Sequence, residues 1–257
     1  MISLLSLFIT LLPVQAFPAS ASKMPPYFVL AGDSTTATQS SDGGGWGDGF
    51  LNTTLFNEAS GHNYGHNGAT TVSFRAGGDW DKVLATVRNV SHEYQPFVTI
   101  QFGHNDQKAA ANISLAEYTV NLQRFVTEAA AAGATPILVT PLSRRNYNNS
   151  TGTPMIIQDL ANQTAATITA AHNTGAAFIN LNRASTDYLN AIGPTDAYTY
   201  NLIPTDHTHL NVDGSIVFGG IVAELIQRDF PKLHAHGFIR VNEKLREDVE
   251  RGIYYWP

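Results

Sequence analysis

The 257-residue sequence contains no cysteine, which excludes disulfide bonds, cysteine nucleophiles and metal sites with thiolate ligands. Charged residues make up only 14% of the chain and form no basic run. Because the formal net charge is −6, binding to nucleic acid or to an anionic membrane surface is disfavoured. No repeat, low-complexity tract or Pro/Gly/Ser linker divides the chain. Hydrophobic residues make up 43%, a composition typical of one globular domain.

The N-terminus carries an uninterrupted apolar run over residues 2–12, which no Lys or Arg precedes. Val14-Gln15-Ala16 fits the small-x-small pattern before a signal-peptidase cut, and the run is too short to span a membrane. We therefore predict a signal peptide over residues 1–20 and a secreted, extracellular protein; a membrane anchor or a buried strand is the alternative. We expect the mature protein to be a monomer without membrane contact. N-glycosylation sequons, which agree with export, begin at Asn52, Asn89, Asn112, Asn148, Asn149 and Asn162.

Short apolar runs alternate with longer segments of helical spacing along the rest of the chain. The runs typical of buried strands cover residues 27–31, 97–102, 136–140 and 177–181. The segments with helical spacing cover residues 46–56, 79–90, 114–132, 155–172 and 213–229. This alternation predicts βαβ units, and hence an α/β fold with a parallel sheet covered on both faces. Such sheets bind ligands beyond the carboxyl ends of their strands.

Two polar clusters follow predicted strands directly, Gly32-Asp33-Ser34 and Gly103-His104-Asn105-Asp106. Both should therefore lie on the edge of the sheet where ligands bind. Ser34 is a candidate nucleophile, because the preceding glycine lets the chain bend and the hydroxyl project. The alternative is that Asp33 or Ser34 only caps the helix or turn that follows.

A serine nucleophile needs a neutral imidazole to take its proton and a carboxylate to orient that imidazole. Asp206 and His209, three residues apart before the last predicted helix, can meet this need within one loop. An alternative makes His207 and His209 metal ligands together with Asp206. Side chains that could join such a metal site are His66, His104 and Asp106.

Three hydrogen-bond donors could stabilise a tetrahedral oxyanion at this edge of the sheet. They are the backbone N–H of Ser34, the backbone N–H of Gly68 in a flexible turn, and the side-chain amide of Asn105. Taken singly, Gly68 and Asn105 are better explained as turn residues.

The order and content of the four segments resemble the SGNH (GDSL-type) hydrolase superfamily from about residue 26 to residue 230. The chain further resembles rhamnogalacturonan acetylesterases in three motifs: Gly45-Trp46-Gly47, Gly103-His104-Asn105-Asp106 and Asp206-His207-Thr208-His209. The resemblance implies a three-layer α/β/α sandwich with a parallel, flavodoxin-like sheet. It also implies a hydrolase without cofactor or metal, in which Ser34 is the nucleophile, His209 the base and Asp206 its orienting partner. Gly68 and Asn105 would then complete the oxyanion hole, with His207 only a neighbour.

The chain departs from this family in two places. Thr35 follows Ser34 at the position where the GDSL motif, after which the superfamily is named, has leucine. Residues 231–257 have no counterpart that we can place. We treat residues 26–230 as the catalytic domain and residues 231–257 as a C-terminal extension. In the extension, residues 242–251 are typical of a charged surface helix, and the Tyr254-Tyr255-Trp256 aromatics are expected to pack back on the body.

The resemblance implies an acetylated plant cell-wall polysaccharide, most simply rhamnogalacturonan, as the substrate. Arg75, Arg144 and Arg145 follow predicted strand ends and could pair with a uronate carboxylate; surface ion pairs are the alternative. A lipase or general short-chain ester hydrolase of the same superfamily would use the same machinery. A noncatalytic carbohydrate-binding protein and a metal-dependent phosphoesterase are two further alternatives.

Overall fold

A five-stranded parallel sheet forms the centre of the protein in the computed structural model, which describes residues 24–150 and 152–257. The predicted signal peptide lies outside the described residues. In spatial order the strands are β2 (Ser60–Asn63), β1 (Pro26–Gly32), β3 (Gln95–Gln101), β4 (Thr135–Val139) and β7 (Ala177–Ile179). The strand order changes direction between β1 and β3, and this is the point where such sheets bind ligands. The predicted parallel, flavodoxin-like sheet is confirmed.

Strand β1 shows why the sheet is covered on both sides. Its side chains alternate, so Phe28 and Leu30 enter one apolar cluster, while Val29 and Ala31 enter the other. All four side chains are fully buried. A strand buried on both faces reads as a continuous apolar run, which is the pattern that predicted it.

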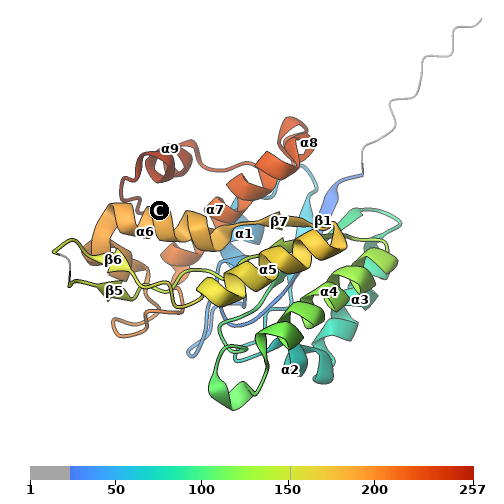
Figure 1. Ribbon diagram of the computed structural model, residues 1–257. Coiled ribbons are helices and arrows are strands. Elements are labelled where there is room, and N and C mark those ends of the chain that lie inside the picture. Colours follow the sequence, from blue (N-terminus) through green and yellow to red (C-terminus); the bar gives the residue numbers. More distant parts are fainter. Residues whose placement is uncertain (1–23, 151) are drawn as a thin grey trace, which may run out of the picture.

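Helices cover the two faces of the sheet as separate layers (Figure 1). One layer contains α2 (Thr71–Ala76), α3 (Asp79–Val90), α4 (Leu115–Ala131) and α5 (Ala161–Thr174). The other contains α1 (Gly47–Thr54), α6 (Leu181–Ala197) and α7 (Val212–Asp229). Short 3₁₀ helices follow β3 and α6 as η1 (Ala109–Ala111) and η2 (Tyr198–Tyr200). The three-layer α/β/α architecture is therefore confirmed.

The prediction of one helix over residues 155–172 is wrong at its start. Met155–Ile156 forms strand β6, which pairs antiparallel with β5 (Tyr147–Asn148), and the helix begins only at Ala161. This hairpin lies beyond the carboxyl end of β4, where the chain would otherwise enter the helix directly. Helix α6, which was not predicted, is broken by Gly193, whose φ of 75° and ψ of 171° are not helical.

The C-terminal extension packs on the same core as the rest of the chain. It forms α8 (Pro231–Ala235) and α9 (Glu243–Arg251), and α9 confirms the predicted charged helix. Ile239 is fully buried and forms a β-bridge with Leu55. At the end of the chain, the Trp256 ring stacks on Tyr200, so the aromatic tail lies against the body as expected.

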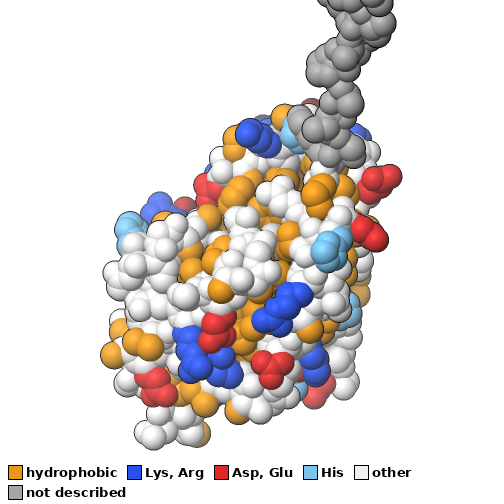
Figure 2. All heavy atoms as spheres, turned by 90° about the vertical axis from the view of Figure 1, so that its right-hand side faces the viewer, with side chains coloured by type: hydrophobic (Ala, Val, Ile, Leu, Met, Phe, Trp, Pro, Cys, Tyr) orange, Lys and Arg blue, Asp and Glu red, His pale blue; other side chains and the backbone are white. Residues whose placement is uncertain are grey.

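The surface carries charges of both signs. On the face shown in Figure 2, basic and acidic side chains are interspersed between apolar ones. Within the described ranges, 24–150 and 152–257, no helix is long and apolar enough to cross a membrane.

Candidate active site

Ser34 lies in the turn that follows β1, and close packing fixes the backbone before it. A side chain at Gly32 would meet the Gln101 carbonyl oxygen at 2.8 Å, so only glycine lets β1 and β3 approach this closely. Asp33 Oδ1 accepts hydrogen bonds from the backbone N–H and the hydroxyl of Thr35, at 2.9 and 2.7 Å. Ser34 is only 4% exposed, and its hydroxyl faces His209.

Asp206 and His209 lie in the loop before α7. They are far from Ser34 in the sequence, but the fold brings His209 into contact with it. His209 Nε2 lies 2.8 Å from Ser34 Oγ, and His209 Nδ1 lies 2.8 Å from Asp206 Oδ2. Because the carboxylate accepts from Nδ1–H, Nε2 is free to accept the serine proton. The structure thus brings the three predicted residues into one hydrogen-bonded chain, with the geometry that nucleophilic acyl transfer requires.

Hydrogen bonds hold the Asp206 carboxylate in its ionised form. Burial alone would raise its pKa, but the bonds from the backbone and side chain of His209 and from Thr208 lower that pKa below its ordinary value. The backbone N–H groups of Thr208 and His209 donate to Oδ1 at 2.9 and 2.8 Å, which leaves Oδ2 for the imidazole. An ionised Asp206 can therefore stabilise the imidazolium that forms when His209 takes a proton.

Gly68 and Asn105 lie beside Ser34, as the candidate oxyanion hole requires. Gly68 has a φ of 77°, a left-handed conformation that glycine adopts without strain. Asn105 Nδ2 donates to the Ala69 carbonyl at 3.0 Å, and so ties the turn after β3 to the turn that carries Gly68. Within the described residues, the backbone N–H groups of Ser34 and Gly68 have no hydrogen-bond acceptor. They are therefore available to an oxyanion in the cleft.

The neighbouring Asp106 is one of the alternative metal ligands, but one oxygen of its carboxylate is bound to the protein. Oδ1 accepts from the backbone N–H and the hydroxyl of Thr71, at 2.8 and 2.6 Å, at the start of α2. Asp106 therefore holds the segment that follows the Gly68 turn.

Asp33 and His104 form a second acid–histidine pair, buried directly behind the serine. His104 Nδ1 lies 3.6 Å from Asp33 Oδ2, and the two side chains are 3% and 0% exposed. Burial alone would raise the pKa of Asp33, but His104 and Thr35 together lower it. The histidine that contacts the Ser34 hydroxyl is His209, so the Asp33–His104 pair supports the serine turn and is not its proton acceptor.

Ser34 and His209, together with Gly68 and Asn105, line a cleft of about 430 Å³. The sequence did not identify Asp42 and Lys108, which line it together with Thr208 of the Asp206–His209 loop. Asp42 and Lys108 lie far apart along the chain, so no local signal shows that they meet. All ten lining residues are polar, charged or glycine: Ser34, Asp42, Asn67, Gly68, His104, Asn105, Lys108, Arg144, Thr208 and His209.

Of the three arginines considered for substrate binding, only Arg144 lines this cleft. Its guanidinium donates to the His104 carbonyl at 3.4 Å, and it is partly exposed. Arg75 instead forms a 2.9 Å ion pair with Glu128, between α2 and α4, away from the cleft. Arg75 thus has the ion pair that was the alternative to substrate contact.

Arg145 does not line the cleft either, and its side chain is fully buried. Its guanidinium donates to Asn201 Oδ1, to the His209 carbonyl at 2.6 Å and to the Asp206 carbonyl at 3.4 Å. Burial lowers the pKa of Arg145 to about 10, although the charge of Asp206 acts in the opposite direction. Arg145 therefore stabilises the loop that carries Asp206 and His209.

The histidines considered as metal ligands bind to the protein itself. His207 Nδ1 lies 2.9 Å from the Arg145 carbonyl oxygen, and His66 Nδ1 lies 2.6 Å from Asp79. In the part of the chain that the structure describes, no group of three or more His, Asp or Glu side chains could hold a metal ion.

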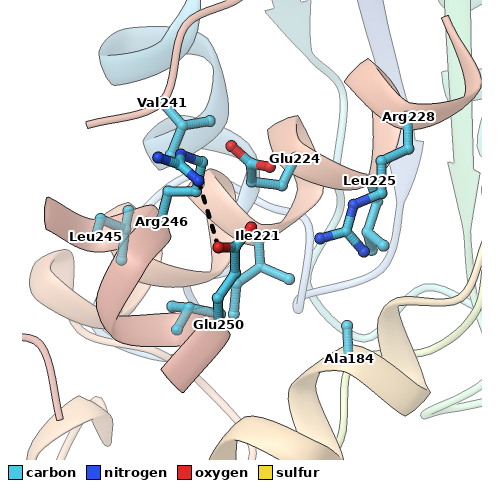
Figure 3. Close-up of a pocket in the computed structure, with 11 residues that line it drawn as sticks. Ala184, Ile221, Glu224, Leu225, Arg228, Val241, Leu245, Arg246 and Glu250 are labelled. Carbon is cyan, nitrogen blue, oxygen red and sulfur yellow. Dashed lines mark hydrogen bonds and ion pairs between the residues drawn. The ribbon is translucent and has the colours of Figure 1, made fainter. Parts of the chain in front are cut away.

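A second hollow lies between α7 and α9, away from the catalytic groups (Figure 3). It is narrow, at about 60 Å³, and is lined by apolar side chains such as Ile221, Leu225 and Leu245. An ion pair between Arg246 and Glu250, at 3.3 Å, lies at its rim. Ser34, His209 and Asp206 do not line it, so this hollow takes no part in their chemistry.

The protein belongs to the GDSL-like lipase/acylhydrolase family, whose model matches residues 30–215, and it is therefore a carboxylic ester hydrolase of the SGNH type. Two relatives from Bacillus subtilis are similar in sequence. A probable rhamnogalacturonan acetylesterase, YesY, is 27% identical over 213 residues, which cover 79% of this chain and 94% of YesY. The rhamnogalacturonan acetylesterase RhgT is 32% identical over 132 residues, 50% of this chain and 54% of RhgT.

Two solved structures share the fold. Protein YxiM of Bacillus subtilis superposes with a TM-score of 0.69 at 22% identity, over 81% of this chain; the match spans only 58% of YxiM. Axe2, an acetylxylan esterase from Geobacillus stearothermophilus, gives a TM-score of 0.55 at 20% identity, over 80% of this chain and 94% of Axe2.

Proposed function

We propose that this protein is a secreted serine esterase that removes O-acetyl groups from plant cell-wall polysaccharide, with acetylated rhamnogalacturonan as the preferred substrate. The observation that carries the proposal is the hydrogen-bonded chain of Ser34, His209 and Asp206, whose serine and histidine line a cleft without hydrophobic residues. In this mechanism His209 takes the hydroxyl proton as Ser34 Oγ attacks the acetyl carbonyl. The N–H groups of Ser34, Gly68 and Asn105 stabilise the oxyanion until the sugar hydroxyl leaves with the proton from His209.

Hydrolysis of the acetyl-enzyme completes the cycle. Water loses a proton to His209 as it attacks the acetyl carbonyl, and the Ser34 hydroxyl is restored when acetate leaves. These roles have support from Axe2, in which three variants described as catalytic mutants replace a serine, an aspartate and a histidine. The aspartate and histidine of Axe2 are three positions apart, as Asp206 and His209 are here.

The lining of the cleft favours a small acyl group on a hydrated polymer. Burial against apolar side chains stabilises a long acyl chain by about 0.8 kcal/mol for each CH₂ group, and none of the ten lining residues is hydrophobic. Polar side chains such as Asn67 and Thr208 can instead hydrogen-bond to sugar hydroxyls. This lining supports the acetylesterase over a long-chain lipase.

Arg144 supports an acidic polysaccharide as the substrate. It is the one predicted arginine that lines the cleft, and a guanidinium can bind a carboxylate with two parallel hydrogen bonds. A uronate residue next to the acetylated sugar would supply that carboxylate. The names of YesY and RhgT support the same substrate class.

The test is the release of acetate from acetylated rhamnogalacturonan, xylan and homogalacturonan by the wild type and by Ser34→Ala. We expect the wild type to release acetate fastest from rhamnogalacturonan and Ser34→Ala to release none above background. Activity retained by Ser34→Ala would refute the mechanism. Faster hydrolysis of octanoate than of acetate nitrophenyl esters would refute the substrate class in favour of a lipase.

A further inference from the structure

The side-chain amide of Asn105 is held at both ends, although it is 93% buried beside Ser34. Its Nδ2 donates to the Ala69 carbonyl at 3.0 Å, and its Oδ1 accepts from the Lys108 ammonium at 2.7 Å. Asn105 itself is only 7% exposed, whereas Lys108 is exposed and lines the same cleft. The Lys108 backbone N–H also donates to the Asn105 carbonyl at 3.1 Å, so the lysine side chain folds back over this turn.

These two contacts permit only one orientation of the amide. In the flipped orientation, the NH₂ group would face the ammonium and the oxygen would face the Ala69 carbonyl, so both contacts would be repulsive. In the orientation observed, one Nδ2 hydrogen is used by Ala69. The second has no acceptor within the described residues, and Asn105 lines the same cleft as Ser34 and Gly68.

We infer that Lys108 is a positioning residue for the oxyanion hole, an assignment that rests on the proposed ester hydrolysis at Ser34. It fixes the direction of the Asn105 donor. Its charge also draws electron density toward Oδ1, which makes the Nδ2–H a stronger donor to a developing oxyanion. The effect operates through Asn105, so it acts on the transition state and not on the affinity for a neutral substrate.

A different role for Lys108, as an anchor for the carboxylate of an acidic polymer, makes opposite predictions. An anchor lowers KM for a charged polymer and does nothing for a small neutral ester. A positioning residue raises kcat for both. Nitrophenyl acetate, which is neutral and small, therefore separates the two roles.

The experiment compares Lys108→Met, Lys108→Arg and Lys232→Met with the wild type on nitrophenyl acetate. Removing an oxyanion donor outright costs about 10²–10³ in kcat, so weakening and misaligning one should lower the kcat of Lys108→Met about 10-fold. KM should stay within about 2-fold, because ground-state binding of this ester does not use the lysine. Lys108→Arg, which keeps a cationic donor, should recover most of the lost kcat.

Lys232→Met is the matched control, since it removes one exposed lysine from α8, and it should behave as the wild type. Thermal melting establishes that all three variants are folded. Unchanged kcat in Lys108→Met on nitrophenyl acetate would overturn the assignment, as would a loss confined to KM on the acidic polymer. Absence of esterase activity in the wild type would instead overturn the proposed function, so the two failures are distinguishable.

Discussion

Arg145 offers a quantitative test of how the catalytic loop is held in place. Replacing it with methionine removes the donor to Asn201 Oδ1, the 2.6 Å donor to the His209 carbonyl and the longer one to the Asp206 carbonyl. A buried acceptor left without a partner costs about 1–3 kcal/mol. Of the two closely bonded acceptors, only Asn201 Oδ1 is left without a partner in the variant, because the His209 carbonyl also accepts from the Leu202 N–H at 3.0 Å. The variant also no longer buries a charge, which offsets part of the loss.

We therefore expect Arg145→Met to lower the free energy of unfolding by about 1–3 kcal/mol. Urea denaturation, followed by tryptophan fluorescence, measures this difference as a shift of the midpoint. Arg144→Met is the control, because its partly exposed side chain lines the cleft and its loss should cost less than about 1 kcal/mol. An Arg145→Met variant as stable as the wild type, but with a raised KM for acidic polymer, would show that Arg145 does not stabilise the loop that carries Asp206 and His209.

Three further predictions follow from the site. His209→Ala should lose at least about 10³-fold in kcat on nitrophenyl acetate, whereas His207→Ala should not, because only His209 contacts the serine hydroxyl; equal losses would contradict this assignment. Asn105→Ala should lower kcat about 10²–10³-fold, and a loss confined to KM would show that the amide binds ground-state substrate. The Asp206 carboxylate has a lowered pKa, so its bonds stabilise the fold above the ordinary carboxyl pKa of about 3.9, and that stability is lost as the pH falls through the lowered value. The unfolding free energy of the wild type should therefore fall more steeply below about pH 4 than that of Asp206→Asn, and parallel curves would contradict the pKa assignment.

The sequence predicted the parts of the fold that depend on local pattern. The run at residues 27–31 lies in β1, because burial on both faces leaves a continuous apolar run. Residues 79–90 form α3 with the predicted bounds, because burial of one face leaves apolar residues at helical spacing. Strand β2 was not predicted, since Ser60–Asn63 is polar and lies at the edge of the sheet. Met155–Ile156 was predicted as helix because only the pairing with β5 makes it a strand, and that pairing is not local.

The candidate site divides in the same way. Ser34, Asp206 and His209 could be found because each lies in a short motif next to a predicted strand or helix. Arg145 could not be told from its neighbour Arg144, since burial of one and exposure of the other depend on how the loop before α7 packs. Lys108 gave no signal, because its contact with the Asn105 amide appears only when the turn after β3 is folded.

The central claim, that Ser34 is the nucleophile, is tested most directly by trapping the acyl-enzyme. Protein quenched in acid during turnover of nitrophenyl acetate is digested, and the acetylated peptide is identified by mass spectrometry. We predict one acetyl group on Ser34, absent from Ser34→Ala and from protein quenched before substrate is added. Turnover without an acetyl group on Ser34 under rapid quenching, or a stoichiometric acetyl group on another residue, would contradict the account.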